Sequence, residues 1–203
     1  MKDTNQVTQL INNSNITAYL NMIKLHDEDT YKHCIAVGTL TYLFLQELQK
    51  QETKPFHVKD INEIIKGALI LDIGKIYLPF GLMRSTKELD KYEQMVLQEH
   101  PLIGYVSIKD SDLSDIIKTI VLKHHCTLND SGYPVGEKIL DNEEYVWVVA
   151  ICDKINAMTS YRPFKESLSY EEAFSEIVKM SKEEVIPYKY MSVLKEVIKR
   201  EAI

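Results

Sequence analysis

Apolar residues recur along this chain at intervals of three and four positions, which is the period of an amphipathic α-helix. The segment from Asp29 to about Lys50 has this pattern throughout and is predicted to be a long core helix. Its apolar face consists of Cys34, Val37, Leu40, Leu43, Phe44 and Leu48. Alternating apolar and polar runs, which indicate half-buried β-strands, are scarce. The pattern therefore predicts an all-α fold in the form of a helical bundle.

Shorter helices are predicted in the middle of the chain. One covers residues 61–74, so Asp72 lies close to its end. Residues 76–87 contain proline and glycine and are expected to form a connecting loop. The next helix covers residues 89–99 and is interrupted at His100, because a residue that precedes proline disfavours the helical conformation. Two polar side chains are thus expected at helix ends.

Two further helices are predicted in the second half of the chain. Residues 112–125 have helical periodicity and end with His124 and His125. Residues 143–160 are strongly apolar and are expected to form a buried helix that carries Asp153 inward, with a strand as the alternative for the first half of this segment. A carboxylate and two imidazoles are therefore expected on or at the ends of core helices.

The two ends of the chain are also predicted to be helical. Residues 1–25 are polar and rich in asparagine, but they carry an apolar stripe at helical spacing. This stripe consists of Val7, Leu10, Ile11, Tyr19, Leu20 and Ile23. Ser169 and Glu172 match a capping box, and an amphipathic helix is expected after Pro187. We expect one globular unit, in which residues 1–25 dock on a main domain of residues 26–203.

The composition favours a cytoplasmic protein without a membrane span. The chain has 203 residues, 45% of them hydrophobic, which is enough for one large core. Its net charge of -6 argues against a polymeric nucleic acid as the partner. The three cysteines lack a paired spacing, and no apolar run has the length needed to cross a bilayer.

The pair His124-His125 precedes a Gly132-Tyr133-Pro134 loop, and core packing seldom requires two adjacent imidazoles. Neutral imidazole nitrogens are ligands for transition metals. The candidate ligands on or at the ends of the predicted helices are His33, Asp72, His100, His124, His125 and Asp153. Imidazole and carboxylate together suit iron, manganese, zinc or nickel better than calcium or magnesium. Such ions, when two are held about 3.5–4 Å apart, promote phosphate-ester hydrolysis.

Five motifs follow one another between about residue 26 and residue 165. They are Asp29-Thr30-Tyr31-Lys32-His33, Leu71-Asp72-Ile73-Gly74-Lys75, Glu99-His100-Pro101 with Gly104, His124-His125 with Gly132-Tyr133-Pro134, and Asp153 through Ala157-Met158-Thr159-Ser160 with Arg162 and Lys165. In order and spacing they resemble the motifs of the HD-GYP phosphodiesterases, a branch of the HD-domain metal-dependent phosphohydrolases. The resemblance implies an HD-domain-like helical bundle and hydrolysis of cyclic di-GMP.

The resemblance also implies roles for individual residues. The six candidate ligands would bind metal, and Asp29 would serve an additional ion. Lys75 would act in catalysis by balancing phosphoryl charge, while Tyr133, Arg162 and Lys165 would contact the phosphates or guanines of the substrate. A second role stays open for Tyr133, because a tyrosine between glycine and proline can fix a turn and bury its ring.

Several positions depart from the pattern of the family. Leu71 stands where the family has its eponymous histidine, and a leucine offers no lone pair to a metal. Cys126 replaces the usual glutamate, Asn129 and Asp130 replace Asp-Gly, and Asn156 replaces a common aspartate. We expect Cys126 to be a structural thiol, with a role as a soft ligand as the alternative.

The ligands that remain predict one well-held ion. By the family pattern, Asp72, His100, His124 and His125 would hold it, while the second site, which needs residue 71, would be weak or empty. Iron or manganese is favoured for this ion, and zinc or nickel are alternatives.

Three functions are compatible with these residues. The first is a metal-dependent phosphodiesterase that hydrolyses cyclic di-GMP, with its activity impaired by the change at Leu71. The second is a degenerate domain that senses a cyclic dinucleotide or binds a protein. The third is hydrolysis of another nucleotide, because one fold hosts many substrates. The expected partners are cyclic di-GMP or a related nucleotide, and either another protein or a second copy of the chain.

Overall fold

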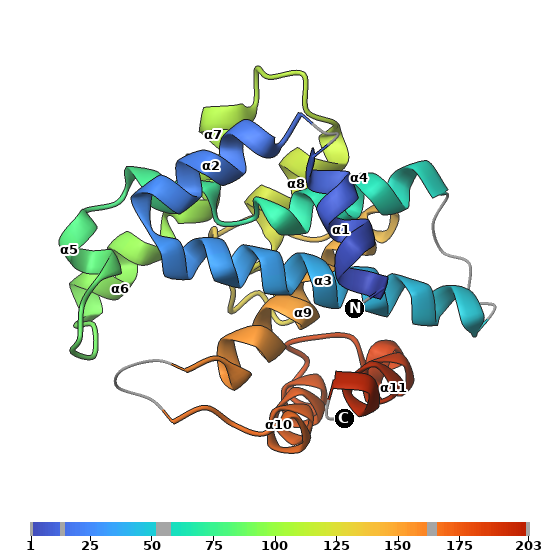
Figure 1. Ribbon diagram of the computed structural model, residues 1–203. Coiled ribbons are helices and arrows are strands. Elements are labelled where there is room, and N and C mark those ends of the chain that lie inside the picture. The colour runs from blue at the N-terminus through green and yellow to red at the C-terminus, as the bar shows by residue number, and fades with distance from the viewer. Residues whose placement is uncertain (1, 13–14, 52–57, 162–165, 202–203) are drawn as a thin grey trace.

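The computed structural model describes residues 2–12, 15–51, 58–161 and 166–201, and all regular elements in these ranges are helices (Figure 1). The first half contains α1 (Lys2–Asn12), α2 (Thr17–His26), α3 (Glu28–Lys50), α4 (Val58–Leu69), the 3-10 helix η1 (Ile73–Tyr77), α5 (Phe80–Met83) and α6 (Lys91–Gln98). The second half contains α7 (His100–Ile108), α8 (Asp115–Lys123), η2 (Asp141–Glu143), α9 (Tyr145–Thr159), α10 (Tyr170–Lys182), η3 (Tyr188–Tyr190) and α11 (Met191–Glu201). The predicted all-α fold is confirmed.

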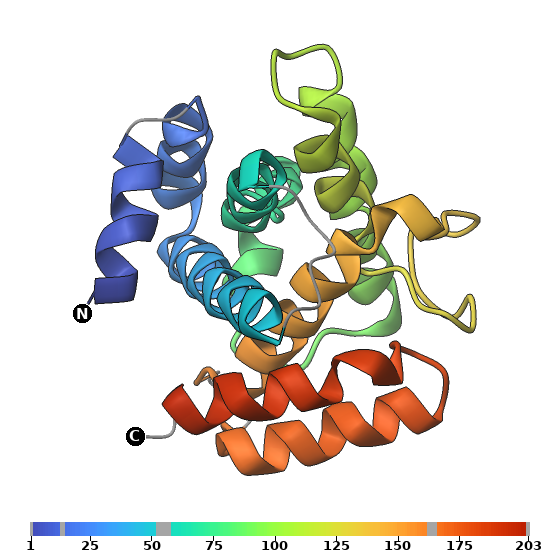
Figure 2. The ribbon, with the colours of Figure 1, turned by 90° about the vertical axis from the view of Figure 1, so that its right-hand side faces the viewer.

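Helix α3 runs through the middle of the bundle, with α1 and α2 on one side and α4 and α9 on others (Figure 2). It begins at Asp27, whose side chain accepts a hydrogen bond of 2.8 Å from the backbone nitrogen of Thr30. The apolar face predicted for residues 29–50 is buried, as expected. Because this helix packs against α1, α2, α4, α9 and α11, side chains on its inner face lie close to several segments of the chain.

The two ends of the chain pack on this central helix. Val7, Leu20 and Ile23 are buried in the same apolar core as α3, so α1 and α2 are docked through part of the predicted stripe. At the other end, α10 and α11 form a pair beside α3 and α9 (Figure 2). The capping box of Ser169 and Glu172 is confirmed at the start of α10. The division of the chain at residue 26 stays a prediction.

Three expectations from the sequence need correction. The helix expected over residues 61–74 ends at Leu69, and Asp72 lies in a turn that precedes η1. Residues 76–87 include the end of η1 and the short helix α5, so they are not simply a loop. The strand considered for the start of residues 143–160 is wrong, because this segment is helical from Tyr145.

Helix α7 was not predicted from the sequence. It begins at His100, where a helix was expected to be interrupted. Pro101 lies in the first turn of α7, where a proline is tolerated because its missing N–H would have no partner within the helix. His100 therefore lies at the start of a helix that directly follows α6.

The close approach of two glycines fixes η1 against α7. A Cβ atom on Gly74 would lie 1.9 Å from the carbonyl oxygen of His100 and 2.6 Å from the backbone nitrogen of Gly104. No larger residue fits at Gly74 without moving one of the two backbones. This contact brings the turn that carries Asp72 beside the start of α7.

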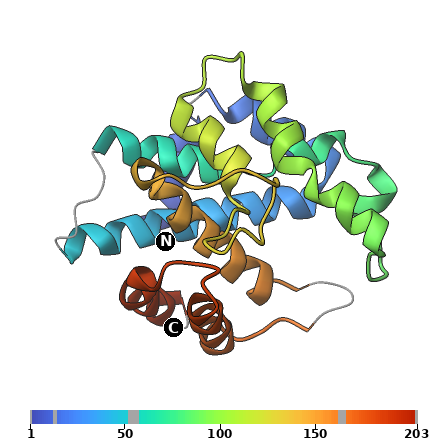
Figure 3. The ribbon, with the colours of Figure 1, turned by 180° about the vertical axis from the view of Figure 1, so that it is seen from behind.

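The long irregular segment between α8 and α9 lies across the middle of the bundle when the molecule is viewed from behind (Figure 3). It starts directly after the histidine pair, so the Gly-Tyr-Pro loop lies near the end of α8 and the start of α7, where the ring centroid of Tyr133 lies 6.2 Å from that of His100. Within the described ranges, no helix combines the length and the apolar character that crossing a bilayer requires.

Candidate metal centre

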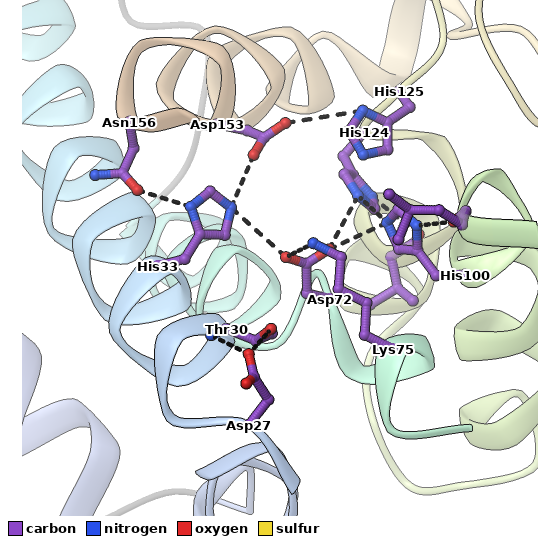
Figure 4. A network of polar contacts seen from close by, with 12 residues as sticks. Asp27, Thr30, His33, Asp72, Lys75, His100, His124, His125, Asp153 and Asn156 are labelled. Atoms are coloured by element: carbon purple, nitrogen blue, oxygen red, sulfur yellow. Dashed lines mark hydrogen bonds and ion pairs between the residues drawn. The ribbon is translucent and has the colours of Figure 1, made fainter. Parts of the chain in front are cut away.

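The six candidate ligands come from separate segments and converge on one buried region (Figure 4). Helix α3 contributes His33, the turn before η1 contributes Asp72, α7 begins with His100, the end of α8 carries His124 and His125, and α9 contributes Asp153. The sequence therefore identified a set of side chains that the fold brings together. Their roles as ligands stay a proposal.

Three histidines form the tightest part of this region. The Nε2 atoms of His100 and His124 lie 3.2 Å apart. One nitrogen from each of His100, His124 and His125 can be chosen so that all three atoms lie within 4.8 Å of one another. This spacing allows the three imidazoles to share one ion.

Backbone carbonyls orient two of the three imidazoles. The Nδ1 atom of His100 donates to the carbonyl oxygen of Leu97 (2.7 Å), and that of His124 donates to the carbonyl oxygens of Ile120 (3.1 Å) and Val121 (3.0 Å). In the neutral form of each ring, the Nε2 atom then carries a lone pair that faces the cluster. Two lone pairs at 3.2 Å repel one another unless a cation lies between them, so these residues fit a metal ion.

The pKa of His124 supports this arrangement. Burial, and then the neighbouring charge of His100, lower the pKa of His124 to about 4. Burial, followed by the charge of His124, also holds the pKa of His125 well below its usual value. Both imidazoles are therefore neutral near pH 7, which is the form that binds transition metals.

The carboxylate of Asp72 faces two groups of partners. Its Oδ1 atom lies 3.1 Å from Nε2 of His100 and 3.9 Å from Nε2 of His124. Its Oδ2 atom accepts a hydrogen bond of 2.7 Å from Nζ of Lys75 and lies 3.6 Å from Nε2 of His33. Burial alone would raise the pKa of Asp72, but the charge of Lys75 and the contact with His100 hold it well below its usual value. Asp72 thus links the histidine cluster to a second polar group.

This second group consists of His33, Asp153 and Asn156. The Nε2 atom of His33 lies 2.9 Å from Oδ1 of Asp153, and its Nδ1 atom lies 2.7 Å from Oδ1 of Asn156. Burial would lower the pKa of His33, but the hydrogen bond and charge of Asp153 raise it above its usual value. Both ring nitrogens of His33 are engaged by side chains, which is consistent with a weaker second ion site.

Of the remaining candidate residues, Tyr133 lies at the cluster and Asp29 lies away from it. The ring of Tyr133 packs on His125, with 4.5 Å between the ring centroids. The side chain of Asp29 is 92% exposed and pairs with Lys32, so it lies outside the buried cluster. Arg162 and Lys165 fall outside the described residues.

Leu71 and Cys126, which also depart from the family pattern, are buried like Asn156. The side chain of Leu71 is fully buried in the apolar core and supplies no donor atom. The thiol of Cys126 donates to the carbonyl oxygen of Tyr133 at 3.9 Å, and burial raises its pKa to about 11. A protonated thiol with a backbone partner supports the structural role expected for Cys126.

Sequence reasoning missed the atoms that orient the ligands. It named Asn156 only as a departure from the family, whereas its side chain contacts His33 from a distance of 123 positions in the chain. It also missed the carbonyl groups of Leu97, Ile120 and Val121. In each case the carbonyl group belongs to a residue three or four positions before the histidine. A histidine at the start or end of a helix is therefore the sequence signal for such a partner.

The ion pair of Lys75 leads to a test of stability. Replacing Lys75 with glutamine is expected to lower the free energy of unfolding of the metal-free protein by about 2 kcal/mol, because the buried carboxylate of Asp72 loses its cation. Urea unfolding in the presence of a chelator measures this change.

Lys66 provides a matched control for this substitution. It pairs with Glu63 at the same distance of 2.7 Å and the same separation of three residues, but Glu63 is less buried than Asp72. Lys66→Gln should cost less than about 1 kcal/mol. Equal losses in the two variants would contradict the special role of the Lys75 pair.

Comparison with known proteins agrees with the geometry. The sequence profile of the HD domain family matches residues 21–186. A protein of Thermotoga maritima named cyclic di-GMP phosphodiesterase is 32% identical over 165 residues, which are 80% of this chain and 43% of that protein. A cyclic di-GMP phosphodiesterase of Pseudomonas aeruginosa is 28% identical over 74% of this chain and 35% of its own length. This chain spans less than half the length of these two relatives.

Solved structures share the fold. The HD domain of the L. monocytogenes phosphodiesterase PgpH superposes with a TM-score of 0.67 at 15% identity, over 90% of this chain and 96% of that domain. An HD-GYP-type protein of Bdellovibrio bacteriovorus superposes with a TM-score of 0.65 at 17% identity, over 98% of this chain and 69% of that chain. The match to the family profile, the relatives and the shared fold confirm the resemblance found in the sequence. The chain belongs to the HD domain family.

Proposed function

We propose that this chain is a metal-dependent phosphodiesterase of HD-GYP type that hydrolyses cyclic di-GMP. The observation that carries the proposal is the position of Asp72, which has one oxygen toward His100 and His124 and the other toward Lys75 and His33. A carboxylate between clustered imidazoles that can hold a metal ion and a cationic side chain suits a phosphate group that must be bound and charge-balanced. The names of the two relatives support cyclic di-GMP as the substrate.

The reaction adds water to phosphorus and breaks one ester bond, with a proton passing to the oxygen that leaves. A divalent ion held in the centre would act as a Lewis acid and stabilise charge on a phosphoryl oxygen. His100, His124, His125 and Asp72 would hold this ion through nitrogen and oxygen donors. Lys75 would balance the charge that develops as the ester bond breaks, since its ammonium group lies 2.7 Å from Asp72 at the edge of the same cluster.

We propose iron or manganese for the well-held ion, with zinc or nickel as alternatives, because several first-row ions accept this donor set. Leu71 offers no ligand, so the second site, near His33 and Asp153, would be weak or empty. The three cysteines are free and buried, which supports a reducing compartment such as the cytoplasm. A protein partner or a second copy of the chain stays a prediction from the sequence.

A catalytically degenerate sensor of cyclic dinucleotides is the second candidate. Leu71 favours it, because the loss of one ligand weakens the second site of a two-ion mechanism. Relatives also widen the choice of nucleotide, since one is named a 3'3'-cGAMP-specific phosphodiesterase and the L. monocytogenes domain has been solved with cyclic-di-AMP. A cyclic dinucleotide is the ligand that all these proteins share.

The experiment that tests the proposal measures turnover of cyclic di-GMP, 3'3'-cGAMP and cyclic-di-AMP by the purified chain. Iron or manganese is added in turn, and chromatography separates the cyclic substrate from its linear product. We expect cyclic di-GMP to be hydrolysed fastest, and we expect a chelator to stop the reaction. Binding of cyclic di-GMP without turnover under every ion would contradict the enzyme and favour the sensor.

A further inference from the structure

The Gly-Tyr-Pro loop folds back on one histidine of the centre. The backbone nitrogen of Tyr133 donates to the carbonyl oxygen of His125 (3.2 Å), and the ring of Tyr133 packs on the imidazole of His125 with 4.5 Å between centroids and 32° between planes. The same tyrosine contacts His125 twice, once through its backbone and once through its ring. The loop is therefore built around His125.

Gly132 makes this return of the chain possible. A Cβ atom at Gly132 would lie 2.3 Å from the carbonyl oxygen of His125 and 2.9 Å from the backbone nitrogen of Thr127. The backbone nitrogen of Gly132 also donates to the hydroxyl of Thr127 (2.9 Å). A glycine is required because any side chain would push the loop away from His125.

His125 needs such support more than the other two histidines. Helix α8 ends at Lys123 with His124 as its C-cap, so His125 lies beyond the helix. His100 and His124 are each anchored by a hydrogen bond from Nδ1 to a backbone carbonyl, whereas no ring nitrogen of His125 forms a hydrogen bond with any described residue. Its Nδ1 atom faces Oδ2 of Asp153 at 3.8 Å. What packs directly on this imidazole is the ring of Tyr133.

We infer that Tyr133 is a positioning residue, whose ring holds the imidazole of His125 in the orientation that binds the metal ion. This inference rests on the metal centre of the proposed function, and it gives Tyr133 a role other than stacking on a guanine. One face of the ring is covered by His125, and its centroid lies 6.2 Å from that of His100 in an edge-on arrangement. The ring thus packs against His125 and has its edge-on neighbour in His100.

Binding of Mn²⁺ by the purified chain, measured by calorimetry, tests the inference. Tyr133→Leu removes the ring and should weaken the affinity by about tenfold or more, as expected when a residue that orients a ligand is lost. Tyr133→Phe keeps the ring and should bind like the parent, because the hydroxyl plays no part. Tyr92→Leu replaces a tyrosine that is 78% exposed on α6 and serves as the matched control.

A double variant shows whether the ring acts through His125. His125→Ala alone should weaken Mn²⁺ binding, and adding Tyr133→Leu to it should cause no further loss, because the ring then has no imidazole to orient. Separate and additive losses would overturn the inference. In the metal-free parent, NMR should detect contacts between the ring protons of Tyr133 and His125, and their absence would also overturn it, even if Tyr133→Leu fails to fold.

Turnover and nucleotide binding separate this inference from the proposed function. If Tyr133→Leu binds Mn²⁺ like the parent but binds cyclic di-GMP more weakly, the ring contacts the substrate and the inference is wrong while the phosphodiesterase stands. If the Mn²⁺ affinities follow the expected order but neither the parent nor any variant hydrolyses cyclic di-GMP, the inference stands and the proposed phosphodiesterase activity is wrong. A parent chain that binds no ion would overturn both.

Discussion

Replacing His124 with alanine is expected to abolish both ion binding and hydrolysis of cyclic di-GMP. The Nε2 atom of His124 faces the Nε2 atom of His100 and the carboxylate of Asp72. Because the side chain is fully buried, no other group can move in to replace it. Loss of a ligand that binds the ion directly should reduce Mn²⁺ affinity by more than about a hundredfold, because losing only an orienting residue already costs about 10–100-fold. Calorimetry measures the affinity, and elemental analysis counts the ions retained.

Two further variants make this result specific. His124→Gln preserves most of the buried volume and guards against a simple loss of folding, which circular dichroism reports. His26→Ala removes a histidine at the end of α2 that packs against Phe80, outside the cluster. It should bind Mn²⁺ like the parent. Retention of the ion by both His124 variants would contradict the proposed centre.

Replacing Leu71 with histidine is expected to raise the metal content from one ion per chain toward two. The new imidazole would directly precede Asp72, whose Oδ2 atom lies 3.6 Å from His33, and His33 in turn contacts Asp153. A second ion would also raise the rate of hydrolysis, because paired ions stabilise the attacking and leaving oxygens together. Elemental analysis after loading with Mn²⁺ measures the stoichiometry, and the turnover assay measures the rate.

The cost of this substitution is measurable as well. Leu71 is fully buried in the apolar core, so a polar ring there should destabilise the metal-free protein by about 1–3 kcal/mol. Added Mn²⁺ should recover that loss only if the ring reaches the ion. Leu71→Gln introduces a polar group of similar length without an imidazole, and it should keep a single ion. If Leu71→His also keeps a single ion, the account of position 71 is wrong.

Helical periodicity predicted the fold well where each helix buries one face. Residues 29–50 form α3 as expected, because their apolar positions lie on one stripe. The sequence failed at α7, since Pro101 was read as the end of a helix although a proline also suits a first turn. It failed again at Asp72, whose turn is fixed by the contact of Gly74 with α7, far along the chain.

The sequence predicted which candidate side chains the fold brings together, but not the contacts that orient them. The spacing of the motifs identified His33, Asp72 and the clustered histidines, because these residue types are rare in a core without a reason. It did not reveal that Asn156 engages His33 or that carbonyl groups turn His100 and His124, since these contacts depend on how distant segments pack. The roles given to Arg162 and Lys165 stay predictions.

The convergence of α3, α7, α9 and the end of α8 on one point has a thermodynamic consequence. In the unfolded chain these donors are far apart, so an ion binds the folded form and pulls the folding equilibrium toward it. A free ion concentration one hundred times the dissociation constant would add about 2.7 kcal/mol to the stability. Metal supply would then act on the abundance of the folded protein as well as on its rate of turnover, and starvation for the ion would expose the chain to proteolysis.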